Sequence, residues 1–155
     1  MTIKISKNRM DLTALPLQNV GTVGLIAAPS VDLTGTGFIT SLTAGTGLVF
    51  GDICYIASTG KAVLGDADAL ATAGAVAMSL ATIANDASGN FLLHGFARND
   101  AWTWTVGGLL YLSTTAGAMT QTAPSGADDV IQVLGVATHA DRIYFNPQLV
   151  QVEHT

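Results

Sequence analysis

Two stretches of the chain share one pattern and decide the fold: residues 51–65 read GDICYIASTGKAVLG, and residues 107–121 read GGLLYLSTTAGAMTQ. In the first, β-favouring residues flank a turn that places Gly60 where a positive φ is needed. A shift of 56 positions aligns Gly51 with Gly107 and Tyr55 with Tyr111 without a gap. The sequence therefore predicts two equivalent strand-turn-strand hairpins, with the two tyrosines in matching places.

The second copy also argues against a chemical site in the hairpin. It keeps the tyrosine but has Gly108 in place of Asp52 and Leu110 in place of Cys54. A catalytic role would not survive the loss of every ionisable group beside the tyrosine. We therefore interpret both hairpins as scaffold, and Cys54 as a core residue and not a reactive thiol.

Short β-rich runs separated by turn signals continue this pattern from Phe38 onward. The runs are GFIT, GLVFGDICYIA, KAVLG, AVAMSLATIA, NFLLHGFA, WTWTV, LLYLST, VIQVLGVAT and RIYFNP. The Ala-rich residues 66–84 favour a helix by composition. Their equivalent in the second copy contains Pro124 and Gly126, which fit a long helix badly, so we expect at most a short helical turn there.

The predicted fold is all-β, a compact barrel or sandwich built from two similar β-meander halves about an approximate two-fold axis. Residues 1–36, with Pro16 and Pro29, are expected to form an extended N-terminal arm and lead-in. Residues 37–150 form the β domain, with repeats at about 37–94 and 95–150, and residues 151–155 form a C-terminal tail.

Composition narrows the classes of function. Only 11% of the 155 residues are charged, the net charge is -5 and the mean hydropathy is +0.46. Such a charge-poor surface indicates burial against neighbouring subunits, and the negative charge argues against nucleic acid as a partner. Residues 67–84 are too weakly apolar to span a membrane. No secretory signal is visible, so we expect synthesis in the cytoplasm, and the single cysteine excludes an internal disulfide.

Basic residues concentrate at the N-terminus, where Ile3 and Ile5 alternate with Lys4. This alternation fits an edge strand added to a neighbour's sheet. A frayed, solvated terminus remains the alternative. The candidate partner-binding residues of this arm are Ile3, Lys4, Ile5, Lys7 and Arg9.

No catalytic, metal or cofactor motif emerges. The histidines His94, His139 and His154 lack ligand or triad spacing, and His139 with Asp141 is interpreted as a solvated contact near a turn. Asp66-Ala-Asp68 lacks the later ligands of a calcium loop. We therefore expect no enzyme activity, no metal and no cofactor.

Trp102-Thr-Trp104 would present both indoles on the same side of a strand. Exposed, Trp102 and Trp104 could form a platform for a sugar or an aromatic ligand. We favour the other interpretation, that they pack against the core or a partner subunit.

The pattern G-D-x-x-Y-x-x-x-x-G-K at residues 51–61, with VGGLLYLSTTAG and VIQVLGVAT, resembles bacteriophage capsid decoration proteins over residues 37–150. The resemblance implies a homotrimer on the outer capsid surface of the virion that binds the major capsid protein and stabilises the shell. Similar domains also occur at the ends of phage tail fibres. The alternative is therefore the tip of a tail fibre that binds a glycan or receptor through Trp102 and Trp104. A virion glycan hydrolase ranks last, because the sequence does not bring carboxylates such as Asp100 and Asp141 together.

Overall fold

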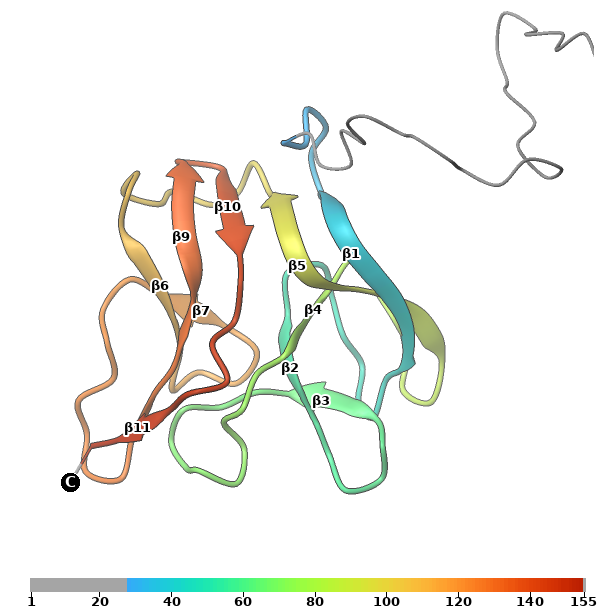
Figure 1. The fold of residues 1–155 in the computed structure, drawn as a ribbon. Helices are drawn as coiled ribbons and strands as arrows, with labels where there is room; N and C mark the ends of the chain where they lie inside the picture. Colours follow the sequence, from blue (N-terminus) through green and yellow to red (C-terminus); the bar gives the residue numbers. More distant parts are fainter. Residues whose placement is uncertain (1–27, 155) are drawn as a thin grey trace, which may run out of the picture.

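The computed structural model describes residues 28–154, which contain no helix. Nine of their eleven strands belong to one antiparallel sheet that curls into a half-barrel (Figure 1). The all-β prediction is confirmed. The five arm residues, which are Ile3, Lys4, Ile5, Lys7 and Arg9, lie outside the described residues.

The strands are short except for two long ones, β1 and β5. Their bounds are β1 Thr34–Thr43, β2 Ile53–Ile56, β3 Ala62–Leu64, β4 Ala77–Ser79, β5 Ser88–Arg98, β6 Leu109–Leu112, β7 Met119–Thr120, β8 Val130–Ile131, β9 Val133–His139, β10 Arg142–Phe145 and β11 Val152–Glu153. Strand β1 begins before residue 37, so the last residues expected in the lead-in already belong to the sheet.

The strand order shows the two halves of the repeat. The main sheet runs β3-β2-β4-β5-β10-β9-β6-β7, β1 adds to β5, and β8 pairs with β11 in a small second sheet. Each half has the same order from its outer edge inward. The first half has the hairpin β2–β3, then the return strand β4 beside β2, then β5. The second half has the hairpin β6–β7, then the return strand β9 beside β6, then β10. A simple meander would instead follow chain order. The halves join where β5 pairs with β10.

The two hairpins are equivalent in register but differ in loop length. Tyr55 lies opposite Val63, and Tyr111 lies opposite Thr120. The tyrosines therefore occupy matching places, as predicted. The first loop is closed by the Ala57 N–H, which donates to the carbonyl of Lys61, and Gly60 has a φ of 76°. In the second hairpin, Ser113 donates to Ala118, so this turn is one residue longer.

The return strands depart further from the gapless alignment. The Gly51 N–H donates to the carbonyl of Ser79, whose own N–H donates to Asp52. In the second half, the Gly107 N–H and the Gly108 carbonyl make the same two bonds with Ala137. Structurally, Ala137 therefore corresponds to Ser79 and not to Ala81, because a longer turn and a bulge between Leu110 and Tyr111 absorb the extra residues.

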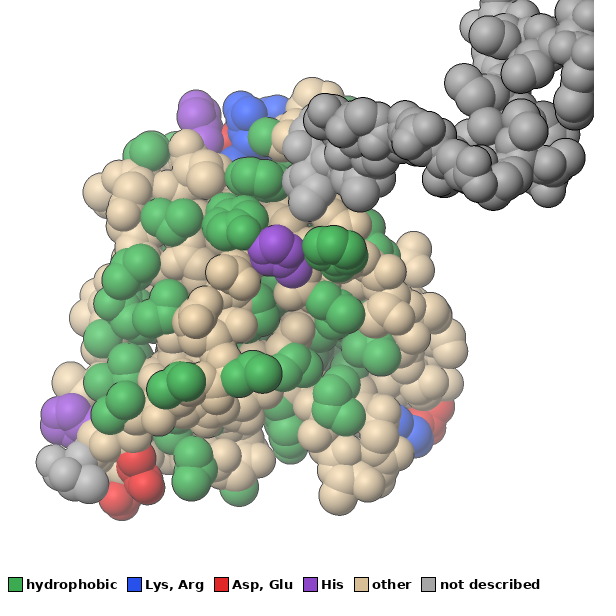
Figure 2. All heavy atoms as spheres, viewed as in Figure 1, with side chains coloured by type: hydrophobic (Ala, Val, Ile, Leu, Met, Phe, Trp, Pro, Cys, Tyr) green, Lys and Arg blue, Asp and Glu red, His purple; other side chains and the backbone are tan. Residues whose placement is uncertain are grey.

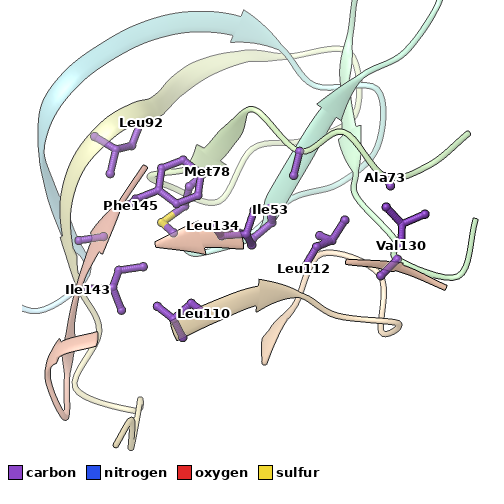
Figure 3. Packing of buried hydrophobic residues seen from close by; sticks show 13 residues of the cluster. Ile53, Ala73, Met78, Leu92, Leu110, Leu112, Val130, Leu134, Ile143 and Phe145 are labelled. Carbon is purple, nitrogen blue, oxygen red and sulfur yellow. The ribbon is translucent and has the colours of Figure 1, made fainter. Parts of the chain in front are cut away.

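Two clusters of buried hydrophobic side chains stabilise the sheet. The larger one draws on both halves, and the smaller one on the first half only. The larger cluster fills the inside of the half-barrel, where Figure 3 shows Phe145, Met78 and Leu92 close together and Leu110 and Leu112 entering from β6. The smaller one packs on the other face of the first half alone; its members are Ala44, Leu48, Cys54, Ala62, Ala77, Ile83 and Phe91. The first half is therefore buried on both faces.

One local expectation holds and one is wrong. Residues 66–84 form turns and then β4, and they include one helical turn, in which the Ala73 N–H donates to the carbonyl of Ala69. Residues 102–106 form no strand, because a turn closes at each end: Trp102 donates to Asn99, and Gly108 donates to Thr105.

Candidate functional site

The outer face of the second half carries a continuous apolar surface. In the ladder, Leu109 pairs with Val136, Val136 with Tyr144, and Tyr144 with Phe96. Residues directly opposite one another in antiparallel strands share a face, so this row crosses four strands. With Phe38 and His94 it forms what we call the outer patch, whose six members are Phe38, His94, Phe96, Leu109, Val136 and Tyr144.

Aromatic contacts hold together the part of the patch that lies on β1, β5 and β10. The Phe38 ring stacks on His94 with centroids 5.8 Å apart, and His94 meets Tyr144 edge-on at 5.2 Å. The His94 Nε2 atom and the Tyr144 hydroxyl are hydrogen-bonded, and Phe96 packs against Tyr144 at 5.2 Å. The interlocked rings give the patch a fixed shape.

The patch is accessible and contains no acidic side chain, lysine or arginine. Phe38 is 61% exposed and Leu109 is 48% exposed, so both side chains are accessible to a partner. Figure 2 shows this face, with apolar side chains and one histidine over its middle and acidic and basic side chains only at its margins. The patch was not predictable from the sequence, because alternation of apolar residues along a strand does not tell which face of the sheet is covered by another layer.

Ion pairs border the patch at one end of β5, β9 and β10. Arg98 contacts both Asp100, at 2.6 Å, and Asp141, at 3.3 Å. The carboxylates that a glycan hydrolase would need are therefore brought together, but around a guanidinium. Burial opposes ionisation of Asp141, yet hydrogen bonds from Arg142 and His139 outweigh it and hold its pKa below the usual value. Such a carboxylate is a poor proton donor at neutral pH.

The tryptophans lie at the junction of the two halves. Both indoles are half-buried and pack against the larger core cluster, with ring centroids 5.9 Å apart. Trp102 also meets Phe50 at 6.3 Å. The rings are therefore neighbours although the segment is no strand, and packing against the core, the favoured interpretation, is what the structure has.

A hollow of about 280 Å³ opens beside these rings. It is lined by Phe50, Gly51, Asp52, Trp102, Trp104, Gly117, Ala118 and Met119. The tip of the second hairpin forms one wall and is fixed by two backbone bonds: Ile53 donates to the carbonyl of Gly117, and Gly117 donates to that of Gly65. We call this feature the junction hollow.

Two ionisable groups lie at or next to the hollow. Burial raises the pKa of Asp52, although the Val49 N–H partly offsets this by donating to Oδ2 at 2.8 Å. Cys54 is fully buried, and burial together with the charge of Asp52 raises its pKa to about 12. Cys54 is therefore a core side chain, as the repeat predicted.

Within residues 28–154, no group of three His, Cys, Asp or Glu side chains could hold a metal ion, and no helix could cross a membrane. No family model and no curated protein matches the chain. The outer patch and the junction hollow are the two surface features that bear on its function.

Proposed function

We propose that the protein is a virion structural protein, a capsid decoration protein that binds the outer surface of a phage head and stabilises the shell. The outer patch carries the proposal: six apolar or aromatic side chains, without acidic or basic neighbours at the centre, form a rigid protein-binding face. The occupant we assign to it is the major capsid protein. Aromatic residues are enriched and charged residues depleted at the centres of such interfaces.

The chain direction supports the same partner. Residues 28–33 lead into β1, and β1 carries Phe38 within the patch. The segment before residue 28 therefore joins the domain at the strand that borders the patch. The proposed arm, with Ile3, Lys4, Ile5, Lys7 and Arg9, and the patch can engage one capsid surface together, which raises the overall affinity. A homotrimer would multiply these contacts further.

Binding to purified shells that lack the protein tests the proposal. The double variant Phe38→Ser with Leu109→Ser should lose at least tenfold in shell affinity and remain folded, because both side chains are largely exposed. The matched control is Leu149→Ser with Val150→Ser, which removes two apolar side chains, 78% and 79% exposed, between β10 and β11. Equal affinity of the two double variants would contradict the proposal.

Two further measurements separate the alternatives. Loss of shell binding on deletion of residues 1–9, with an unchanged oligomeric state, would support the arm. If the patch variant instead dissociates an oligomer of this chain, a second copy and not the capsid covers the patch. Electron microscopy of labelled virions places the protein on the head or on the tail.

The tail-fibre alternative would use Trp102 and Trp104 to bind a glycan. Within residues 28–154, the junction hollow beside them presents one charged side chain, Asp52, and two indoles, whereas sugars are bound through several polar groups. Binding to a glycan array that is lost in Trp102→Ala would favour this alternative over the capsid.

A further inference from the structure

We infer that the junction hollow is a binding site for a cationic side chain, a lysine or an arginine, presented by a partner protein. The hollow combines a wall of three aromatic rings with one carboxylate. This inference does not depend on the capsid proposal, since any protein partner could supply the cation.

The aromatic wall is continuous. Phe50, Trp102 and Trp104 follow one another at centroid distances of 6.3 and 5.9 Å, with the planes tilted by 38° and 50°. Glycines keep the space beside the rings open: a Cβ atom on Gly51 would lie 3.3 Å from the Trp102 ring. Aromatic faces attract ammonium and guanidinium groups, tryptophan most strongly.

The carboxylate of Asp52 lacks a cation within the described part of the chain. The ion pairs of Lys61, Arg98 and Arg142 go to other carboxylates. One oxygen of Asp52 accepts the Val49 N–H, and the other faces Gly117, where a Cβ atom would lie 3.3 Å away. A partly buried charge without a counter-charge is unfavourable, and burial already raises its pKa. A bound cation would relieve this cost.

The scaffold does not require these residues, as the other half of the repeat shows. Gly108 occupies the place of Asp52 in the second hairpin, and Leu48 corresponds to Trp104. The backbone N–H of Leu48 donates to the carbonyl of Ile83, and the backbone N–H of Trp104 likewise donates to the carbonyl of Ala140. Leucine fills its position with no polar atom to satisfy, whereas Trp104 buries an Nε1–H that has no acceptor among residues 28–154.

Charge and lining favour a cation over a sugar or an apolar ligand. Among residues 28–154, Asp52 is the only charged side chain that lines the hollow, and the other lining side chains are aromatic or apolar. A neutral apolar guest would leave the carboxylate uncompensated, and the buried Nε1–H of Trp104 is not available to a sugar hydroxyl. The net charge of -5 also attracts cationic partners.

The test uses the full-length protein and three small probes followed by NMR on the indole N–H signals. Butylammonium stands for lysine, ethylguanidinium stands for arginine, and 1-pentanol is the neutral control of similar size. We expect at least one of the two cations to shift both indole signals saturably, and pentanol to leave them unchanged. Equal shifts with pentanol, or no shift with either cation, would overturn the inference.

Variants locate the effect at Asp52. Asp52→Asn should weaken cation binding at least tenfold, and binding to the unmodified protein should weaken as the pH falls through the raised pKa of Asp52. Asp128→Asn removes an exposed carboxylate with the same change of charge and should bind as the unmodified protein does. Unfolding curves establish that both variants are folded. Undiminished binding by Asp52→Asn would refute the assignment, and neither result depends on capsids.

Discussion

Gly37 and Gly95 lie directly opposite each other in the β1–β5 pair, and neither position has room for a Cβ atom. A Cβ on Gly37 would lie 2.2 Å from the carbonyl oxygen of His94, and one on Gly95 would lie 2.1 Å from that of Thr36. Their φ angles are 141° and 147°. On its other side Gly95 pairs with Phe145, so the close approach lies where the sheet curls around the core.

Gly95→Ala should therefore be severely destabilising. The added methyl group meets backbone and not a mobile side chain, and the φ angle disfavours alanine, so we expect a loss of about 3 kcal/mol or more in the free energy of unfolding. Denaturant titration measures it. Gly47→Ala is the control: nothing lies within 4 Å of its Cβ position, and the change should stay within about 0.5 kcal/mol. Similar losses in both variants would refute the steric argument.

Gln132 is a buried amide whose replacement should weaken the contact between distant segments. Its Oε1 accepts the Ala75 N–H, and its Nε2 donates to the carbonyls of Ala75 and Gln148. Gln132→Leu leaves these groups unpaired and should cost about 3 kcal/mol of unfolding free energy.

Gln132→Glu supplies the matching pH test. A glutamate there has no amide N–H to donate to the carbonyls of Ala75 and Gln148. Its ionised form would be a buried negative charge facing these carbonyls, so we expect the folded state to raise its pKa. The variant should therefore be least stable near neutral pH and recover part of the loss on acidification, as the carboxyl gains a proton that it can donate. A deficit that does not depend on pH would contradict this role.

Cys54 should not react with thiol reagents in the native protein. Burial raises its pKa to about 12, so at pH 8 the thiolate that attacks such reagents is scarce and shielded. Ellman's reagent should label Cys54 only when denaturant unfolds the chain. Thr59→Cys, at an exposed hairpin position, should react at once in the native state. Rapid native labelling in the unmodified protein would show that the first half opens locally.

Asp141 should make stability depend on pH and salt. Its pKa is lowered in the folded state, so its stabilising effect is present above the unfolded value, about 3.9, and is lost as the pH falls through the folded value. Asp141→Asn should be less stable than the unmodified protein at pH 7, and the two should converge in strong acid. High salt should narrow the gap at pH 7. A gap that persists in strong acid would point to packing instead of charge.

The repeat made much of the fold predictable. Glycine and tyrosine at matched spacing in the two hairpins predicted two equivalent halves, and the strand order of the sheet reads the same from both ends. Which residue of β4 corresponds to which residue of β9 was not predictable from the sequence. Matches such as Ala81 with Ala137 carry little information in an alanine-rich chain. Hydrogen bonds and not identities fix the register there.

The candidate sites were less accessible to sequence reasoning. Trp102 and Trp104 stood out by their chemistry, but their place beside Phe50 and Asp52 around the junction hollow depends on how the second hairpin docks on β2. The outer patch left no local signal. Leu109 and Ile53 occupy equivalent places in the repeat, yet Ile53 is fully buried in the larger cluster and Leu109 is half-exposed on the outer patch, so equivalent residues of the two hairpins serve different faces of the sheet.

The position of β1 has a consequence for how the chain folds during synthesis. Its partner is β5, and the strands β2, β3 and β4 all lie between them in the sequence. A ribosome therefore releases β1, with Phe38 and Ile39, well before the strand that pairs with it. Such long-range pairing slows folding and prolongs the time in which an unpaired apolar strand can associate with another chain. Rapid synthesis at high concentration should thus favour aggregation through β1, and slower synthesis at lower temperature should favour the native sheet.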